Sequence, residues 1–179
     1  RLDRIEHAVA QLKRAGNIHV HLDLIAGLPF EDYESFGHSF DTVYAMEPEQ
    51  LQLGFLKVLW GSYMQEKAKD YELKYLTTAP YEVLSTKWLS YGDVVRLKRV
   101  EEMVELYYNS NQFTTTLPLL EAFFARPFAM YQALADFYED NGYFVTTPSR
   151  IYRYQVLLDF ILSIAPGEHL AYFKEALTY

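Results

Sequence analysis

The stretch NIHVHLDLIAGLPFEDYESF (residues 17–36) decides how the start of this chain is interpreted. Apolar and polar residues alternate through residues 18–25, and a period of two predicts a β-strand. Gly-Leu-Pro at residues 27–29 then predicts a turn. Asp32 is a good N-cap residue for a helix that would run to about Met46. The stretch therefore predicts a strand, a sharp turn and a helix.

The flanking segments extend this pattern into a small α/β unit. Apolar residues at helical spacing over residues 2–12 predict a helix before the strand, and QLQLGFL at residues 50–56 predicts a second strand. Helix, strand, helix and strand with short links are typical of parallel pairing. Two parallel strands cannot cover their own faces and edges, and the chain begins at Arg1 inside a helix. We therefore expect a piece of a longer polypeptide.

The sequence pattern changes twice in the rest of the chain. Residues 63–91 are irregular and rich in aromatic side chains, and YELKYL and YEVLST on either side of TTAP predict a short hairpin. Residues 92–179 show helical periodicity almost throughout. We expect an α/β segment over residues 1–62, a linker over 63–91 and a helical domain over 92–179, so that the chain is mostly helical.

Composition excludes several classes of site. Half of the residues are hydrophobic and 17% are aromatic, which is enough apolar mass for a packed core. The sequence contains no cysteine, so these residues can form no disulfide, no thiolate nucleophile and no cysteine-bound iron–sulfur cluster.

Charge and hydropathy argue against two kinds of partner. The formal net charge is -8, and the only basic run, residues 96–99, lies among apolar residues at helical spacing. We interpret that run as a solvated helix face and expect no binding to duplex nucleic acid. No apolar run approaches the roughly 18 residues needed to cross a membrane, and no signal peptide is apparent. We expect a cytoplasmic protein without a membrane partner.

The polar face of the first strand is the best candidate site. Side chains alternate across a strand, so His19, His21, Asp23 and Ile25 share one face. In a barrel of parallel strands this face would point inward, with Asp23 near the C-terminal end where such barrels place their sites. A metal site is disfavoured because three ligands spaced over about 13 Å of strand cannot reach one ion unaided. Two interpretations stay open: a hydrogen-bonded barrel interior, and a polar ligand held by Asp23 beside Ile25.

A phosphate site in the turn is weaker still. AGLPFED has a single glycine, and its two acids would repel an anion. The acids instead suit the N-terminus of the following helix, where the helix dipole favours negative charge.

The same stretch resembles a known family. HLDLIAGLPFEDYESF is similar to the Asp-Leu-Ile-x-Gly-Leu-Pro-Gly-Glu segment of radical S-adenosylmethionine (radical SAM) enzymes, above all in the branch with a cobalamin-binding domain ahead of the barrel. EPEQLQLGFLKVLWGSYM resembles the last barrel strand of that family. APYEVLSTKWLS and the helices after it are similar to a C-terminal domain of unknown function in the same branch. The resemblance implies the last strands of a partial (β/α) barrel followed by a helical accessory domain.

The resemblance also implies roles for the first strand and its turn. Asp23 would bind a polar part of S-adenosylmethionine, and Ile25 would pack on its adenine. Gly27 would let the backbone pass the ligand, and Glu31 would stabilise the turn. Phe30 departs from the pattern because the family usually has glycine at this position.

On the second strand, Gln52, Gly54 and Leu56 would line the same pocket. The family's three-cysteine loop, which holds a [4Fe–4S] cluster, is not in these residues, and neither is a cobalamin domain. The resemblance therefore implies part of an iron–sulfur oxidoreductase that is inactive alone and has no catalytic residue or metal ligand in this chain. The upstream barrel and cobalamin domains would be its partners, and the substrate is not identified.

A second hypothesis needs no cofactor. The helical half could be a protein-interaction module, with the α/β segment as a structural stub. The aromatic side chains of that half are mostly core by spacing, although a subset could line a groove. Trp60 and Trp88 could each plug a barrel end or contact a substrate. The isolated chain could also pair its exposed strand edge with another copy.

Overall fold

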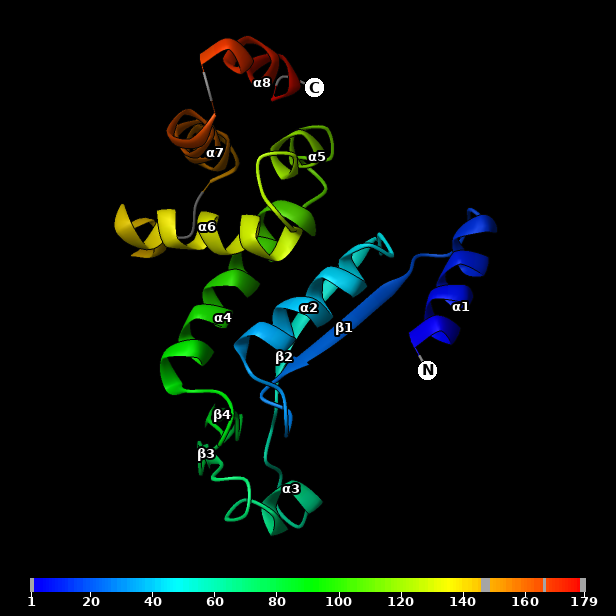
Figure 1. Cartoon of the computed structure of the whole chain (residues 1–179), viewed down its shortest axis with the longest axis vertical. Helices are drawn as coiled ribbons and strands as arrows, with labels where there is room; N and C mark the ends of the chain where they lie inside the picture. The colour runs from blue at the N-terminus through cyan, green and yellow to red at the C-terminus, as the bar shows by residue number, and fades with distance from the viewer. Residues whose placement is uncertain (1, 146–148, 166, 178–179) are drawn as a thin grey trace. The chain divides into compact units, whose positions relative to one another are not determined.

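The computed structural model describes residues 2–145, 149–165 and 167–177. Within these residues the chain forms eight α-helices and two small two-stranded sheets (Figure 1). This confirms a mostly helical chain with a small α/β part, and the described strands do not close into a barrel. The chain divides into two compact units, Arg1–Glu101 and Glu102–Tyr179.

The first unit opens with the predicted parallel arrangement. Its first four elements are α1 (Leu2–Arg14), β1 (His21–Ala26), α2 (Tyr33–Tyr44) and β2 (Gln50–Phe55). β1 and β2 pair in parallel along their whole lengths, and α2, the helix between them, packs against β1. The predicted order of helix, strand, helix and strand is therefore confirmed.

The first strand begins three residues later than residues 18–25 predict. The backbone N–H of Val20 donates to the Glu49 carboxylate at 2.7 Å instead of to a neighbouring strand. β2 begins only at Gln50, whose N–H donates to the Val20 carbonyl at 3.3 Å. Residues before Val20 therefore have no strand beside them in the described fold.

The turn after β1 leads into a well-capped helix. Asp32 is the N-cap of α2, and its side chain accepts from the backbone N–H of Ser35 at 2.9 Å. The Ser35 hydroxyl accepts from the Asp32 N–H at 2.8 Å, which completes a reciprocal capping box. Phe36 and Phe40 form the buried side of the helix. The prediction of a helix capped by Asp32 is confirmed.

The remainder of the first unit contains the predicted hairpin. Its elements are α3 (Tyr63–Glu66), β3 (Lys74–Tyr75), β4 (Val83–Ser85) and α4 (Tyr91–Met103). β3 and β4 are antiparallel, as expected for the segments on either side of residues 77–80. A small core of Leu56, Val58, Leu73 and Val83 joins this hairpin to the chain leaving β2.

The second unit is helical. After a π-helical turn at Val104–Tyr108 it contains α5 (Thr116–Glu121), α6 (Pro127–Asp140), α7 (Arg150–Ile164) and α8 (Leu170–Ala176). Tyr107 and Tyr138 are fully buried in it, and their hydroxyl oxygens lie 2.6 Å apart. Tyr107 also donates to the Arg153 carbonyl at 3.2 Å. Burial raises the pKa of Tyr107, and it raises the pKa of Tyr138 to about 12.

Candidate functional site

Strand register brings four of the predicted site residues together. Asp23 pairs with Gln52, and Ile25 pairs with Gly54. Because alternate residues of paired strands face the same way, these four share one face of the sheet. Leu51 on the opposite face is fully buried, whereas Ile25 is 47% exposed. The two-stranded sheet therefore keeps one packed face and one open face.

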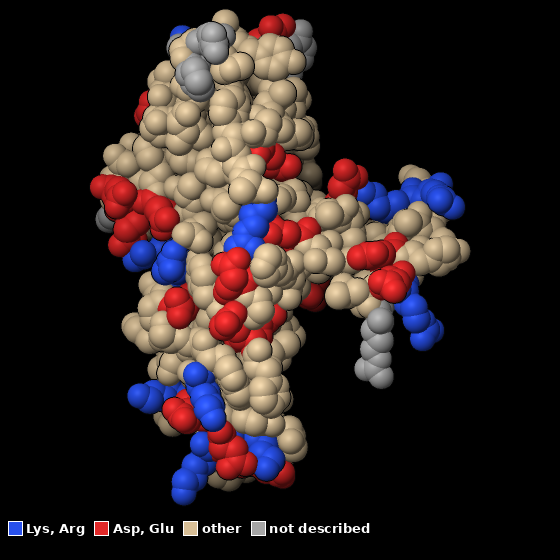
Figure 2. Space-filling view, in the orientation of Figure 1, with Lys and Arg blue, Asp and Glu red and all other residues tan. Residues whose placement is uncertain are grey.

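The open face forms the wall of a depression of about 560 Å³. Five predicted residues line it: Asp23, Ile25, Gln52, Gly54 and Leu56. Lys57, Glu82 and Glu101 also line it, so that both charged and apolar side chains contribute to its wall. Acidic and basic side chains are likewise interspersed over the face shown in Figure 2, without a continuous basic surface.

Asp23 already has one partner on its own strand. The Nε2 atom of His21 lies 2.9 Å from Oδ1 of Asp23, and both side chains are largely exposed. Their contact follows from the alternation of the strand, which places residues two apart on one face. Oδ1 is thus held by His21, and Oδ2 is available to a ligand. Among the described residues no group of three or more His, Cys, Asp or Glu side chains could hold a metal ion.

Gly27 is the first residue of the turn after β1. Its φ of +86° is in the left-handed region, which confirms the predicted role in turning the chain. A Cβ placed on it would lie 2.7 Å from Cγ1 of Val83, so the hairpin occupies the space beside it. The close approach seen here is made by a protein side chain, and Gly27 does not line the depression.

Glu31 ties the same turn to α2. Its Oε1 accepts from the Ser39 hydroxyl at 3.0 Å, and its backbone N–H donates to the Leu28 carbonyl at 3.4 Å. Partial burial raises the pKa of Glu31, while the bond from Ser39 opposes this shift. Like Gly27, Glu31 acts on the turn and is not part of the wall of the depression.

Sequence reasoning missed Glu82 and Glu101, which line the depression, and it also missed the contacts that Lys98 and Arg96 of α4 make. Lys98 belongs to the basic run interpreted as a solvated face, yet its Nζ is 2.5 Å from Oε2 of Glu82 and 4.0 Å from the centre of the Phe55 ring. Arg96 in the same run lies 4.5 Å from the centre of the Tyr33 ring. Lys98 keeps a partly solvated position on α4, with 40% of its side chain exposed, and makes these contacts in addition. Local periodicity carried no signal for these long-range contacts.

Comparison with known proteins identifies the second part of the chain. Residues 69–179, more than half of the 179 residues, match the family described as "Protein of unknown function (DUF4080)". The chain belongs to this family. No curated protein matches the sequence significantly. In the part of the chain that the structure describes, no helix has the length and apolar character required to cross a membrane.

Proposed function

We propose that this DUF4080 chain is the C-terminal portion of a radical SAM iron–sulfur oxidoreductase and supplies part of the S-adenosylmethionine pocket. One observation carries the proposal: the strand register gathers Asp23, Ile25, Gln52 and Gly54 on an open face of parallel strands, beside a depression. In parallel α/β folds, sites form at the C-terminal ends of the strands. The DUF4080 domain is also associated with the C-terminal region of radical SAM/cobalamin proteins, which supports the same assignment.

The residues on this face fit the chemistry of the cofactor. S-adenosylmethionine presents hydroxyl and ammonium donors together with a flat adenine. The free oxygen of Asp23 can accept from such donors, and the exposed Ile25 side chain offers an apolar surface for the ring. Gly54 adds no side chain to the wall, and a Cβ there would meet only the Leu24 carbonyl, at 3.6 Å.

The residues present in this chain indicate which parts of the reaction it would support and which the rest of the polypeptide would supply. The cofactor supplies the radical chemistry, and the protein binds, orients and shields it. This sequence has no cysteine, so the cluster ligands would come from the upstream barrel of the same polypeptide. Cobalamin, where the full protein uses it, would likewise be held upstream. These residues alone are then not a catalyst.

The proposal is tested by S-adenosylmethionine binding to the full polypeptide. The protein would be reconstituted with iron and sulfide without oxygen, and binding would be measured by calorimetry. Asp23→Ala removes a charge-assisted hydrogen bond and is expected to weaken binding by about 1.5–3 kcal/mol, or roughly ten- to a hundredfold. Asp136→Ala is the matched control, because Asp136 is exposed on α6 in the second unit.

Each outcome bears on a different part of the proposal. Equal binding by the wild type and Asp23→Ala would make Asp23 a packing residue and remove it from the site. A wild type that does not bind would overturn the radical SAM assignment. The upstream sequence gives an independent check, since Cys-x-x-x-Cys-x-x-Cys after a strand is required for the cluster. An unrelated upstream domain would favour the helical interaction module.

A further inference from the structure

The family match does not begin at the boundary between the two compact units. The match starts at residue 69, whereas the first compact unit extends to Glu101. Residues 69–101 therefore belong to the DUF4080 region and also pack within the α/β unit. Their contacts show what this overlapping segment does there.

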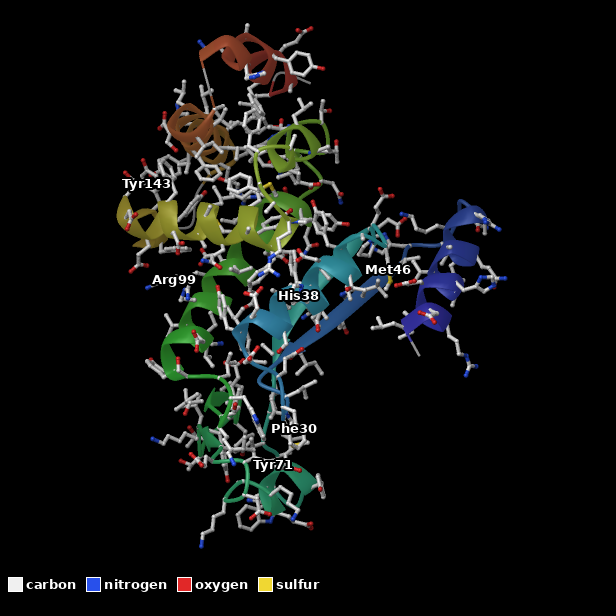
Figure 3. The ribbon with its side chains drawn as sticks, in the orientation of Figure 1. Phe30, His38, Met46, Tyr71, Arg99 and Tyr143 are labelled. Carbon is white, nitrogen blue, oxygen red and sulfur yellow. The ribbon has the colours of Figure 1, made fainter. Side chains whose placement is uncertain are left out.

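The overlapping segment holds the turn after β1 through aromatic rings. The ring of Phe30 lies 4.7 Å from that of Trp88 and 5.8 Å from that of Tyr71, between ring centres. Tyr71 and Trp88 also contact each other, at 5.6 Å. Figure 3 shows Phe30 and Tyr71 directed toward each other from separate parts of the chain. Val83 fills the space beside Gly27 in the same turn.

Phe30 is an unusual residue for its backbone conformation. Its φ is +70°, in the left-handed region that favours glycine. Its side chain is 75% exposed, so burial does not explain the choice of an aromatic residue. The ring contacts with Trp88 and Tyr71 are what distinguish it from glycine at this position. Strained positions of this kind concentrate where function requires a fixed geometry.

The same segment also holds the end of β2. The Val83 N–H donates to the Leu56 carbonyl at 2.8 Å, and the Val58 N–H donates to the Tyr81 carbonyl at 2.8 Å. Lys98 contacts both the Phe55 ring and Glu82, which lines the depression. Both strand ends are thus attached to the beginning of the family region.

We infer that Tyr71, Val83, Trp88 and Lys98 form a clasp that fixes the two strand ends, and that Phe30 is the positioning residue through which the clasp sets ligand affinity. The inference rests on the proposed function for the identity of the ligand, S-adenosylmethionine. It assigns a role to the first part of the DUF4080 region, namely fixing the turn beside the site. Phe30 acts through the turn and does not line the depression.

The test compares three variants of the full polypeptide. Phe30→Gly removes the ring and tolerates the left-handed backbone, and Phe30→Tyr keeps an aromatic ring. Asn111→Gly is the matched control, because Asn111 has a φ of +54° and belongs to the second unit. Two quantities are measured: amide hydrogen exchange of residues 27–31 without ligand, and S-adenosylmethionine binding by calorimetry.

Phe30→Gly is expected to speed exchange in the turn and to weaken binding about two- to tenfold, as loss of an aromatic contact would. Phe30→Tyr should restore both quantities, and Asn111→Gly should change neither. Unchanged exchange in Phe30→Gly would overturn the clasp, and faster exchange with unchanged affinity would overturn its positioning role. If the wild type does not bind, the proposed function and the positioning role both fail, while exchange still decides whether the clasp exists.

Discussion

The helical unit and the strand-end region, meaning β1, β2 and the turn after β1, differ in how completely they bury their side chains. In the helical unit, Tyr107 and Tyr138 are buried and pair their hydroxyl groups with each other. In the strand-end region, Asp23 and Ile25 stay exposed beside a depression. Helices satisfy their own backbone and need only one covered face, whereas a two-stranded parallel sheet cannot cover both of its faces. The open face of this sheet therefore leaves room for a ligand.

The largest expected effect contrasts a core residue with a residue of the open face. Phe128 is fully buried in α6, and Phe128→Ala should cost about 3–5 kcal/mol of unfolding free energy through lost burial and a cavity. Ile25→Ala on the open face should cost no more than about 0.5 kcal/mol. Urea unfolding of the 179-residue chain measures both. Similar losses from the two variants would show that the sheet face is not open.

An intermediate effect tests the contact between the turn and the hairpin. Gly27→Ala forces a left-handed alanine and brings its Cβ against Val83, so we expect a loss of about 2–4 kcal/mol. Gly16→Ala is the matched control, because Gly16 has a φ of +68° but no atom within 4 Å of its Cβ position. It should lose only the conformational part, about 1–2 kcal/mol.

Val83 is fully buried, so Val83→Ala should destabilise the wild type; it should cost less in the Gly27→Ala background, because there it also removes the atom that clashes. Equal losses for Gly27→Ala and Gly16→Ala in thermal or urea unfolding would rule out the close approach of Val83.

The smallest effect probes the buried tyrosine pair. Tyr138→Phe removes one hydrogen bond and should cost about 0.5–1.5 kcal/mol at neutral pH. Burial raises the pKa of Tyr138 to about 12, whereas an unfolded tyrosine titrates near about 10. The unfolded chain therefore loses this proton first, and its contribution to stability declines as the pH rises from about 10 to about 12.

Unfolding measured at about pH 9 and about pH 11 should show a smaller alkaline loss in Tyr138→Phe than in the wild type. The exposed Tyr172→Phe is the control and should keep the full loss. An equal alkaline loss in Tyr138→Phe and the wild type would place this tyrosine outside a buried pair.

Local sequence patterns predicted much of the fold and which strand residues share the face of the candidate site. Alternation predicted both strands, and the turn residues and Asp32 predicted the helix between them. Parallel pairing then placed Asp23 next to Gln52, since a period of two fixes which residues share a face. These features depend on residues close in sequence or on the register of one strand pair.

Contacts between distant segments could not be predicted in the same way. Val83 beside Gly27, Trp88 on Phe30 and Lys98 on Glu82 each depend on how the hairpin and α4 fold back onto the strands. The late start of β1 has the same origin, because it depends on the Glu49 carboxylate and on where β2 begins. Periodicity shows which face of an element is apolar and does not show what covers it.

The central claim is that the open strand face is the wall of a ligand site. It is tested most directly by hydrogen exchange of the reconstituted full polypeptide with and without S-adenosylmethionine, followed peptide by peptide. We predict slower exchange with the ligand over residues 22–31 and 52–58, and no change over α6. Slowing confined to the helical unit, or no slowing around the strand ends with ligand bound, would contradict the account.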